Sequence, residues 1–152
     1  MLNRLQDVFK SFQQHEVRYI VVGGVASVLH GVPLATFDLD ILIDPTDDNA
    51  LRLLSALVDA GFGTATMTNA QEILAHEITV FNDRVRIDVQ TRTPGVFFQD
   101  AWRRRKTVTY QGQDLFILSK EDLIASKQAS GREVDLEDVH MLQLPDQEEG
   151  TS

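Results

Sequence analysis

Hydrophobic and polar positions along this chain follow two different periods, and the change between them separates helices from strands. Apolar residues recur at helical spacing through residues 2–14, which predicts an amphipathic helix. The apolar run RYIVV (18–22) predicts a buried strand that ends at Gly23-Gly24. Residues 25–30 lack strand alternation and predict a short helix ending at Gly31.

The next segment, FDLDILID (37–44), alternates as a strand does and ends before Pro45. Thr46 is expected to cap a helix that runs to about Ala60. Its apolar stripe contains Leu51, Leu54 and Val58, with Leu53 and Leu57 beside it. Two further runs, EITVF and RVRIDVQ, flank Asn82-Asp83 and predict a hairpin.

The last third of the chain predicts a second hairpin and two helices. TVTY and DLFIL flank residues 111–113 as short strands, whereas residues 92–106 show no clear period. Ser119 to Asp122 matches a capping box ahead of the helix DLIASKQA, and a final helix is expected over 134–142. The tail PDQEEGTS (145–152) is expected to be disordered and acidic.

This order of elements predicts an α/β (α+β) fold with a mixed β-sheet flanked by helices. Neither a repeat nor a linker interrupts the pattern, so residues 1–144 are expected to form a single domain.

Composition narrows the class of protein. The 152 residues are 43% hydrophobic and 24% charged, as in ordinary soluble globular proteins, and none is a cysteine. The sequence contains neither an apolar stretch of membrane-spanning length nor a signal-peptide pattern, so we expect a cytoplasmic protein that does not associate with membranes. A net charge of −9 argues against broad, sequence-independent binding of nucleic acid.

Three aspartates are candidate metal ligands. Asp38 and Asp40 stand two apart on a predicted strand and therefore point to the same face, where their charges repel. Asp88 lies on the polar face of RVRIDVQ and would meet them if the two strands are neighbours. Carboxylates of this kind suit Mg²⁺. The alternatives are two solvated Asp residues on the first strand and an Asp88 that simply pairs with Arg84 or Arg86.

Gly23-Gly24 falls between a strand and a helix, where glycine lets backbone N–H groups approach an anion closely. A glycine pair alone is most often only a tight turn. This one lacks the lysine of a P-loop and the third glycine of a dinucleotide-binding motif. Its position shortly before Asp38 and Asp40 favours a phosphate-binding turn.

Taken together, the segment YIVVGGVASVLHGVPLATFDLDILID and the later RIDVQ resemble the signature of the polymerase-beta-like nucleotidyltransferase superfamily. The chain is most similar to the minimal bacterial nucleotidyltransferases of toxin–antitoxin and abortive-infection systems. In these proteins a segment like SKEDLIASKQASGREVDLEDVHML commonly follows, so the resemblance spans roughly residues 18–142.

The resemblance implies a nucleotidyltransferase-like sheet and a two-metal reaction that uses Mg²⁺ or Mn²⁺. Asp38, Asp40 and Asp88 would be both catalytic residues and metal ligands. Gly23 and Gly24 would hold a nucleoside triphosphate, with Lys127 and Arg132 as basic contacts. The acceptor hydroxyl would belong to a protein, RNA or small molecule. Many relatives carry an Arg at the position of Leu34, so its charge is absent here or supplied elsewhere.

Two other functions fit parts of the sequence. A glycosyltransferase also uses an Asp-x-Asp pair, but the glycine turn would then be unexplained. A catalytically degenerate nucleotidyltransferase could serve as an antitoxin or a protein-binding partner. The four histidines show no ligand spacing and are expected to be structural, and the basic run 103–106 is interpreted as a solvated face. The neighbouring Trp102, Phe97 and Phe98 are expected in the core.

Overall fold

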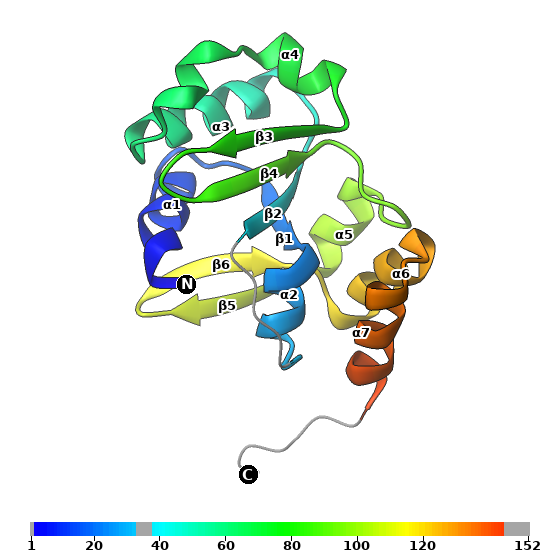
Figure 1. The fold of residues 1–152 in the computed structure, drawn as a ribbon. Helices are drawn as coiled ribbons and strands as arrows, with labels where there is room; N and C mark the ends of the chain where they lie inside the picture. Colours follow the sequence, from blue (N-terminus) through cyan, green and yellow to red (C-terminus); the bar gives the residue numbers. More distant parts are fainter. Residues whose placement is uncertain (1, 33–37, 145–152) are drawn as a thin grey trace.

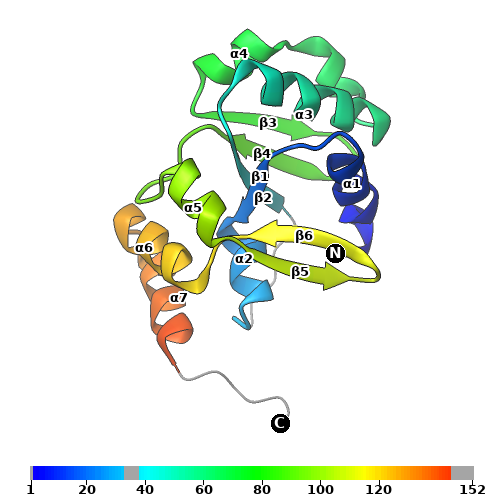
Figure 2. The same ribbon diagram turned by 180° about the vertical axis from the view of Figure 1, so that it is seen from behind.

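The computed structural model describes residues 2–32 and 38–144, and Figures 1 and 2 show it from opposite sides. Its helices are α1 (Leu2–Gln14), α2 (Gly23–Leu29), α3 (Asp47–Asp59), the 3-10 helix η1 (Gly63–Met67), α4 (Ala70–Ala75), α5 (Phe98–Arg104), α6 (Lys120–Ser130) and α7 (Glu133–Gln143). The strands are β1 (Tyr19–Val22), β2 (Asp38–Ile43), β3 (Ile78–Asn82), β4 (Arg86–Gln90), β5 (Lys106–Tyr110) and β6 (Gln113–Ile117).

All six of these strands form one mixed sheet in the order β3-β4-β2-β1-β6-β5. The two hairpins lie at its outer edges and are antiparallel, as the sequence predicts. Between them, β1 pairs antiparallel with β2, while β4 runs parallel to β2 and β6 runs parallel to β1. The parallel pairings join segments that are distant in sequence, and they determine which polar residues meet.

The helices cover the two faces of the sheet unequally. Figure 2 shows α1 and α3 in front of the sheet, and their buried side chains form the main core with the strands. On the opposite side, α2 lies next to the inner strand β1, and α6 and α7 lie beside α2 (Figure 1). Among the described elements, no helix is drawn in front of β3 and β4, so this part of the face is uncovered.

The predicted caps are found where the sequence placed them. The Thr46 side chain accepts a hydrogen bond from the backbone N–H of Asn49, and that of Ser119 accepts one from Asp122. Each oxygen satisfies a backbone donor that the first turn of a helix leaves unpaired. Predicted and observed helices therefore begin within a residue or two of each other at α3 and α6.

Four features differ from the predictions. Helix α2 begins at Gly23 rather than after the glycine pair. The short helices η1, α4 and α5 are not predicted, because their residues show no clear helical period. On α3 the residues that face the core are Leu53, Leu54 and Leu57, whereas Leu51 and Val58 are exposed. Phe98 is buried, but Phe97 is 80% exposed, so its prediction as a core residue is wrong. The predicted acidic tail lies outside the described residues.

No helix in the described part of the chain is long and apolar enough to cross a membrane.

Candidate active site

Asp38, Asp40 and Asp88 meet on one face of the sheet because β2 and β4 are parallel neighbours. The register pairs Asp40 with Asp88 and Asp38 with Arg86. Paired residues on adjacent strands project to the same side, and residues two apart share a side as well. The carboxylates of Asp38 and Asp40 therefore lie beside that of Asp88, while Leu39 and Ile41 are fully buried on the other face.

Crowding of these carboxylates changes the protonation of Asp40. Burial, followed by the negative charges of Asp88 and Asp38 and a side-chain hydrogen bond with Asp88, raises the pKa of Asp40 from 3.8 to about 7. A negative charge at this position is thus penalised both by lost hydration and by its neighbours. A bound cation would remove most of that penalty.

Gly23 lies directly against the Asp40 carboxylate. Its φ of +69° is in the left-handed region, and a Cβ built on it would stand 2.5 Å from Asp40 Oδ2. Glycine is therefore required at position 23 both for its backbone conformation and for the space beside Asp40. Gly24 is the second residue of α2 and is partly buried.

Arg86 is the cationic residue that contacts these carboxylates most closely in the described part of the chain. Its Nε donates to Asp88 Oδ1 at 2.9 Å and its Nη2 donates to Asp88 Oδ2 at 3.3 Å. The same Nε lies 3.9 Å from Asp38 Oδ2. The pairing of Asp88 with Arg86 that the sequence left as an alternative is therefore present, and it coexists with the three-carboxylate arrangement.

The three carboxylates are suitable ligands for a divalent cation, although their side chains do not yet point to one common ion position. Within residues 2–32 and 38–144, no three His, Cys, Asp or Glu side chains converge on one ion position. Mg²⁺ needs fewer, since it commonly takes one or two carboxylates and completes its shell with water and substrate phosphates. Asp38 and Asp40, with Asp88 once released from Arg86, could hold such an ion.

The comparisons with known proteins identify the family. A family model described as "Nucleotidyltransferase of unknown function (DUF6036)" matches residues 2–148. The chain belongs to this family. A search of curated proteins finds no significant match.

Solved nucleotidyltransferase-type structures share the fold of this family member. One, from Thermotoga maritima and assigned as a nucleotidyltransferase, is 17% identical with a TM-score of 0.54; the match covers 93% of this chain and 89% of that one. An antigenic nucleotidyltransferase-like protein from Paracoccidioides brasiliensis is 17% identical with a TM-score of 0.57, covering 91% and 72% of the two chains. At this identity the likeness establishes the fold alone.

The two predicted basic contacts of this nucleotidyltransferase-family chain occupy different environments. Lys127 is only 6% exposed, and its Nζ lies 3.1 Å from Asp138 Oδ2 and 3.4 Å from Asp135 Oδ1. The side chain of Arg132 is 72% exposed, although its Nε also pairs with Asp135 at 2.6 Å. Lys127 therefore joins α6 to α7, whereas Arg132 presents a largely solvated guanidinium.

Arg132 is sensitive to the negative charge of the carboxylates. A hydrogen bond to Asp135 raises the pKa of Arg132 above its ordinary value, and the negative charge of Asp40 adds to that shift. The negative charge of Asp40 therefore acts on Arg132, whereas Lys127 is paired with Asp135 and Asp138.

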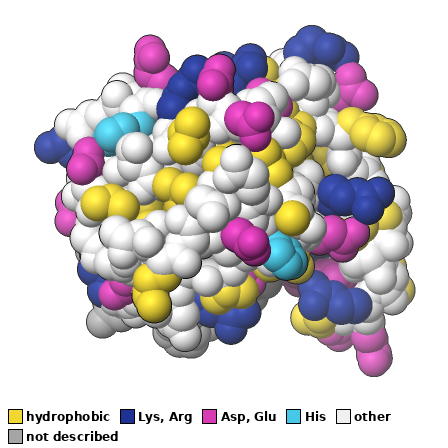
Figure 3. All heavy atoms as spheres, turned by 90° about the horizontal axis from the view of Figure 1, so that it is seen from above, with side chains coloured by type: hydrophobic (Ala, Val, Ile, Leu, Met, Phe, Trp, Pro, Cys, Tyr) yellow, Lys and Arg dark blue, Asp and Glu magenta, His cyan; other side chains and the backbone are white. Residues whose placement is uncertain are grey.

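The other polar candidates have local partners. His30 Nε2 is 2.7 Å from the carbonyl oxygen of Leu118, and His15 Nε2 is 2.6 Å from Asp59 Oδ2. Within the basic run, Arg104 pairs with Asp122, and Arg105 stacks on Trp102. In the view from above, basic and acidic side chains are interspersed (Figure 3). The face seen there offers no broad cationic surface for nucleic acid.

Sequence reasoning selected the three carboxylates that meet on this face but gave Arg86 no place beside them. Arg86 is two residues before Asp88, so strand alternation already puts both on one face. What the sequence did not specify was that β2 lies next to β4, a pairing that places Arg86 opposite Asp38. Leu34, at the position where many relatives carry an Arg, lies outside the described residues.

Proposed function

We propose that this chain is a metal-dependent nucleotidyltransferase that moves a nucleoside monophosphate from a nucleoside triphosphate to a hydroxyl acceptor. The observation that supports this most strongly is the register of β2 and β4, which pairs Asp40 with Asp88 beside Asp38. Membership of a nucleotidyltransferase family agrees with it. Because nucleoside triphosphates are cytoplasmic metabolites, the proposed place of action is the cytoplasm.

In this proposal Asp38 and Asp40 hold Mg²⁺ or Mn²⁺, and Asp88 completes the site beside the acceptor. The bound ions would neutralise phosphate charge and lower the pKa of the acceptor hydroxyl. The acceptor oxygen bonds to the α-phosphorus as the bond to the bridging oxygen breaks. Pyrophosphate leaves, and the hydroxyl proton passes to solvent. Gly23 and Gly24 allow the triphosphate to approach the backbone, and Arg132 supplies positive charge.

The acceptor has an open approach over β3 and β4. Val80 pairs with Asp88 and Ile78 pairs with Gln90, so both project to the carboxylate face. They are 45% and 53% exposed, which leaves apolar surface uncovered next to the site. That surface suits an acceptor with apolar groups beside its hydroxyl, on a protein or a small molecule, better than it suits RNA.

The proposal is tested by melting temperature and by product formation. Mn²⁺ with each nucleoside triphosphate should raise the melting temperature of the wild type, and α-labelled nucleotide should become attached to an acceptor in a lysate. Asp40→Asn should abolish both effects. The matched control is Asp59→Asn, an exposed aspartate on α3 that pairs with His15. Equal responses of wild type and Asp40→Asn would falsify the metal role.

A second candidate function is favoured by the Arg86 contacts. A guanidinium that already neutralises Asp88 and approaches Asp38 could replace the metal altogether. The chain would then be a catalytically degenerate member of the family and act by binding a protein, for example as the antitoxin of a toxin–antitoxin pair. The same melting experiment separates the two, because the degenerate form should respond to neither Mn²⁺ nor nucleotide.

A further inference from the structure

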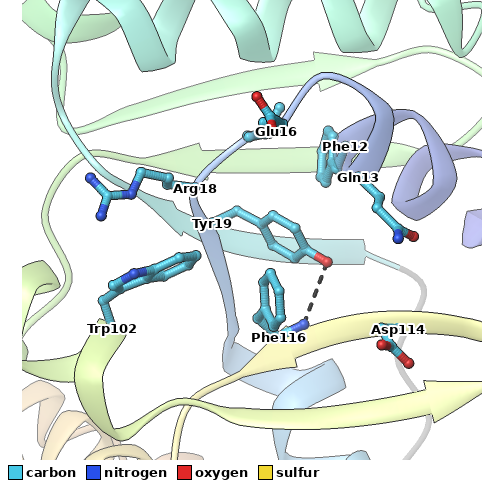
Figure 4. A pocket seen from close by; sticks show the side chains of 9 residues that line it. Phe12, Gln13, Glu16, Arg18, Tyr19, Trp102, Asp114 and Phe116 are labelled. Atoms are coloured by element: carbon cyan, nitrogen blue, oxygen red, sulfur yellow. Dashed lines mark hydrogen bonds between the residues drawn. The ribbon is translucent and has the colours of Figure 1, made fainter.

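A cavity of about 270 Å³ opens where the end of α1, the start of β1, α5 and β6 meet. Its wall contains the rings of Phe12, Tyr19, Trp102 and Phe116 (Figure 4). Tyr19 is three residues before Val22, which pairs with Asp40, so the Tyr19 ring points to the face of the sheet opposite the carboxylates. The cavity is therefore separate from the proposed active site.

The aromatic rings of this cavity form one continuous surface. The centroids of Tyr19 and Phe116 are 5.6 Å apart, and those of Phe116 and Trp102 are 5.4 Å apart. Phe116 and Trp102 are each partly exposed, so a ligand can reach their rings. The rest of the protein therefore covers the aromatic surface of the cavity only in part.

Two carboxylates line the same cavity and lack a cationic partner. Glu16 and Asp114 are both exposed, and neither forms an ion pair within the described part of the chain. Asp114 accepts only a hydrogen bond from the Thr109 hydroxyl. Arg18 also lines the cavity, but its charge is balanced by the buried Asp44 carboxylate at 3.0 Å. Of the three charged side chains that line the cavity, only Arg18 forms an ion pair within the described residues, and the two carboxylates stay available to a cationic ligand.

The rings already attract cations of the chain itself. The guanidinium carbon of Arg105 lies 3.7 Å from the centroid of the Trp102 ring and 4.7 Å from that of Phe116. These distances are within the range of cation–π attraction. Burial raises the pKa of Tyr19 above its ordinary value, and the charge of Asp114 adds to the shift.

We propose that this cavity binds a small organic cation with an apolar body, such as a benzylammonium or a quaternary ammonium compound. The rings contact the apolar body and attract the charge, while Glu16 and Asp114 neutralise it. An anionic ligand would meet the two unpaired carboxylates, and a neutral one would forgo the charge attraction. The site does not depend on the proposed nucleotidyl transfer.

The test uses the fluorescence of Trp102, which is the only tryptophan in the sequence and lines the cavity. The probe is benzyltrimethylammonium, titrated without metal or nucleotide, and compared with its neutral isostere 2,2-dimethylpropylbenzene. The cation should give a saturable change and bind at least about tenfold more tightly than the isostere. Glu16→Gln and Asp114→Asn should each weaken binding about fivefold.

Glu137→Gln is the matched control, since Glu137 is exposed on α7 and does not line the cavity; it should leave the affinity unchanged. Phe116→Leu keeps an apolar side chain but removes the ring, and it should weaken the cation more than the isostere. Three results would each overturn the proposal: absence of a saturable change, equal affinity for cation and isostere, or unaltered affinity in both carboxylate variants.

Discussion

Arg86 holds Asp88 through two hydrogen bonds, from Nε at 2.9 Å and from Nη2 at 3.3 Å, within the same strand and on the same face. The guanidinium lies where a divalent cation would reduce the same repulsion. In the proposed function, metal binding and this ion pair would therefore compete for Asp88.

Arg86→Gln should raise the affinity for Mn²⁺, because the cation no longer has to displace a guanidinium. We expect a gain of about tenfold, which corresponds to about 1.4 kcal/mol. Electron paramagnetic resonance of free Mn²⁺ measures this without any enzymatic assay. Arg92→Gln is the control, since Arg92 is exposed and pairs with Glu77 instead. A loss of Mn²⁺ affinity in Arg86→Gln would mean that Arg86 assists the metal rather than opposing it.

Asp40 should make the metal-free protein less stable as pH rises from about 4 to about 7. Its pKa is about 7 in the folded state against 3.8 ordinarily, so the folded protein binds the extra proton between these values and raising the pH removes it. The contribution is roughly 2–4 kcal/mol. Urea denaturation in EDTA should therefore show Asp40→Asn gaining stability over wild type as pH rises. Parallel pH profiles of the two proteins would contradict this.

Gly23→Ala should destabilise the fold and also disturb the carboxylates. The left-handed backbone costs the new side chain about 1 kcal/mol, and the contact with Asp40 adds to that cost. Gly112→Ala isolates the backbone effect, because Gly112 has a φ of +79° and open space around it. Only the Gly23 variant should lose Mn²⁺ affinity as well as stability. If both variants lose the same stability and both bind Mn²⁺ as the wild type does, Gly23 is not part of the metal site.

Substitution of Lys127 should mainly lower stability, whereas substitution of Arg132 should mainly lower nucleotide affinity. Lys127→Ala leaves Asp138 and part of Asp135 unpaired near the α6–α7 contact and should cost about 2–4 kcal/mol of unfolding free energy. It should change nucleotide affinity little. Arg132→Ala should do the reverse, weakening nucleoside triphosphate binding about tenfold at low salt and less at high salt. Isothermal titration with nucleotide at two salt concentrations and thermal unfolding distinguish the two variants. If Lys127→Ala loses nucleotide affinity and Arg132→Ala loses only stability, Lys127 is the phosphate contact.

The sequence by itself determined most elements and the direction of the key side chains within them. Strand period alone put Asp38 and Asp40 on one face and Leu39 and Ile41 on the other. Capping residues located the starts of α3 and α6 because the hydrogen bond is made within one turn of chain. These are local properties, set by residues two to four apart.

Only the tertiary structure decided which of these residues meet. The pairing of β2 with β4 joins Asp40 to Asp88 across a gap of 48 positions, and no local pattern specifies that neighbour. The same holds for α3, where Leu51 and Val58 are exposed while Leu53 and Leu57 are buried in the core. Lysine is usually a surface residue, yet the packing of α7 on α6 buries Lys127 against two aspartates. Non-local contacts depend on how all the elements pack at once, which side-chain period alone does not encode.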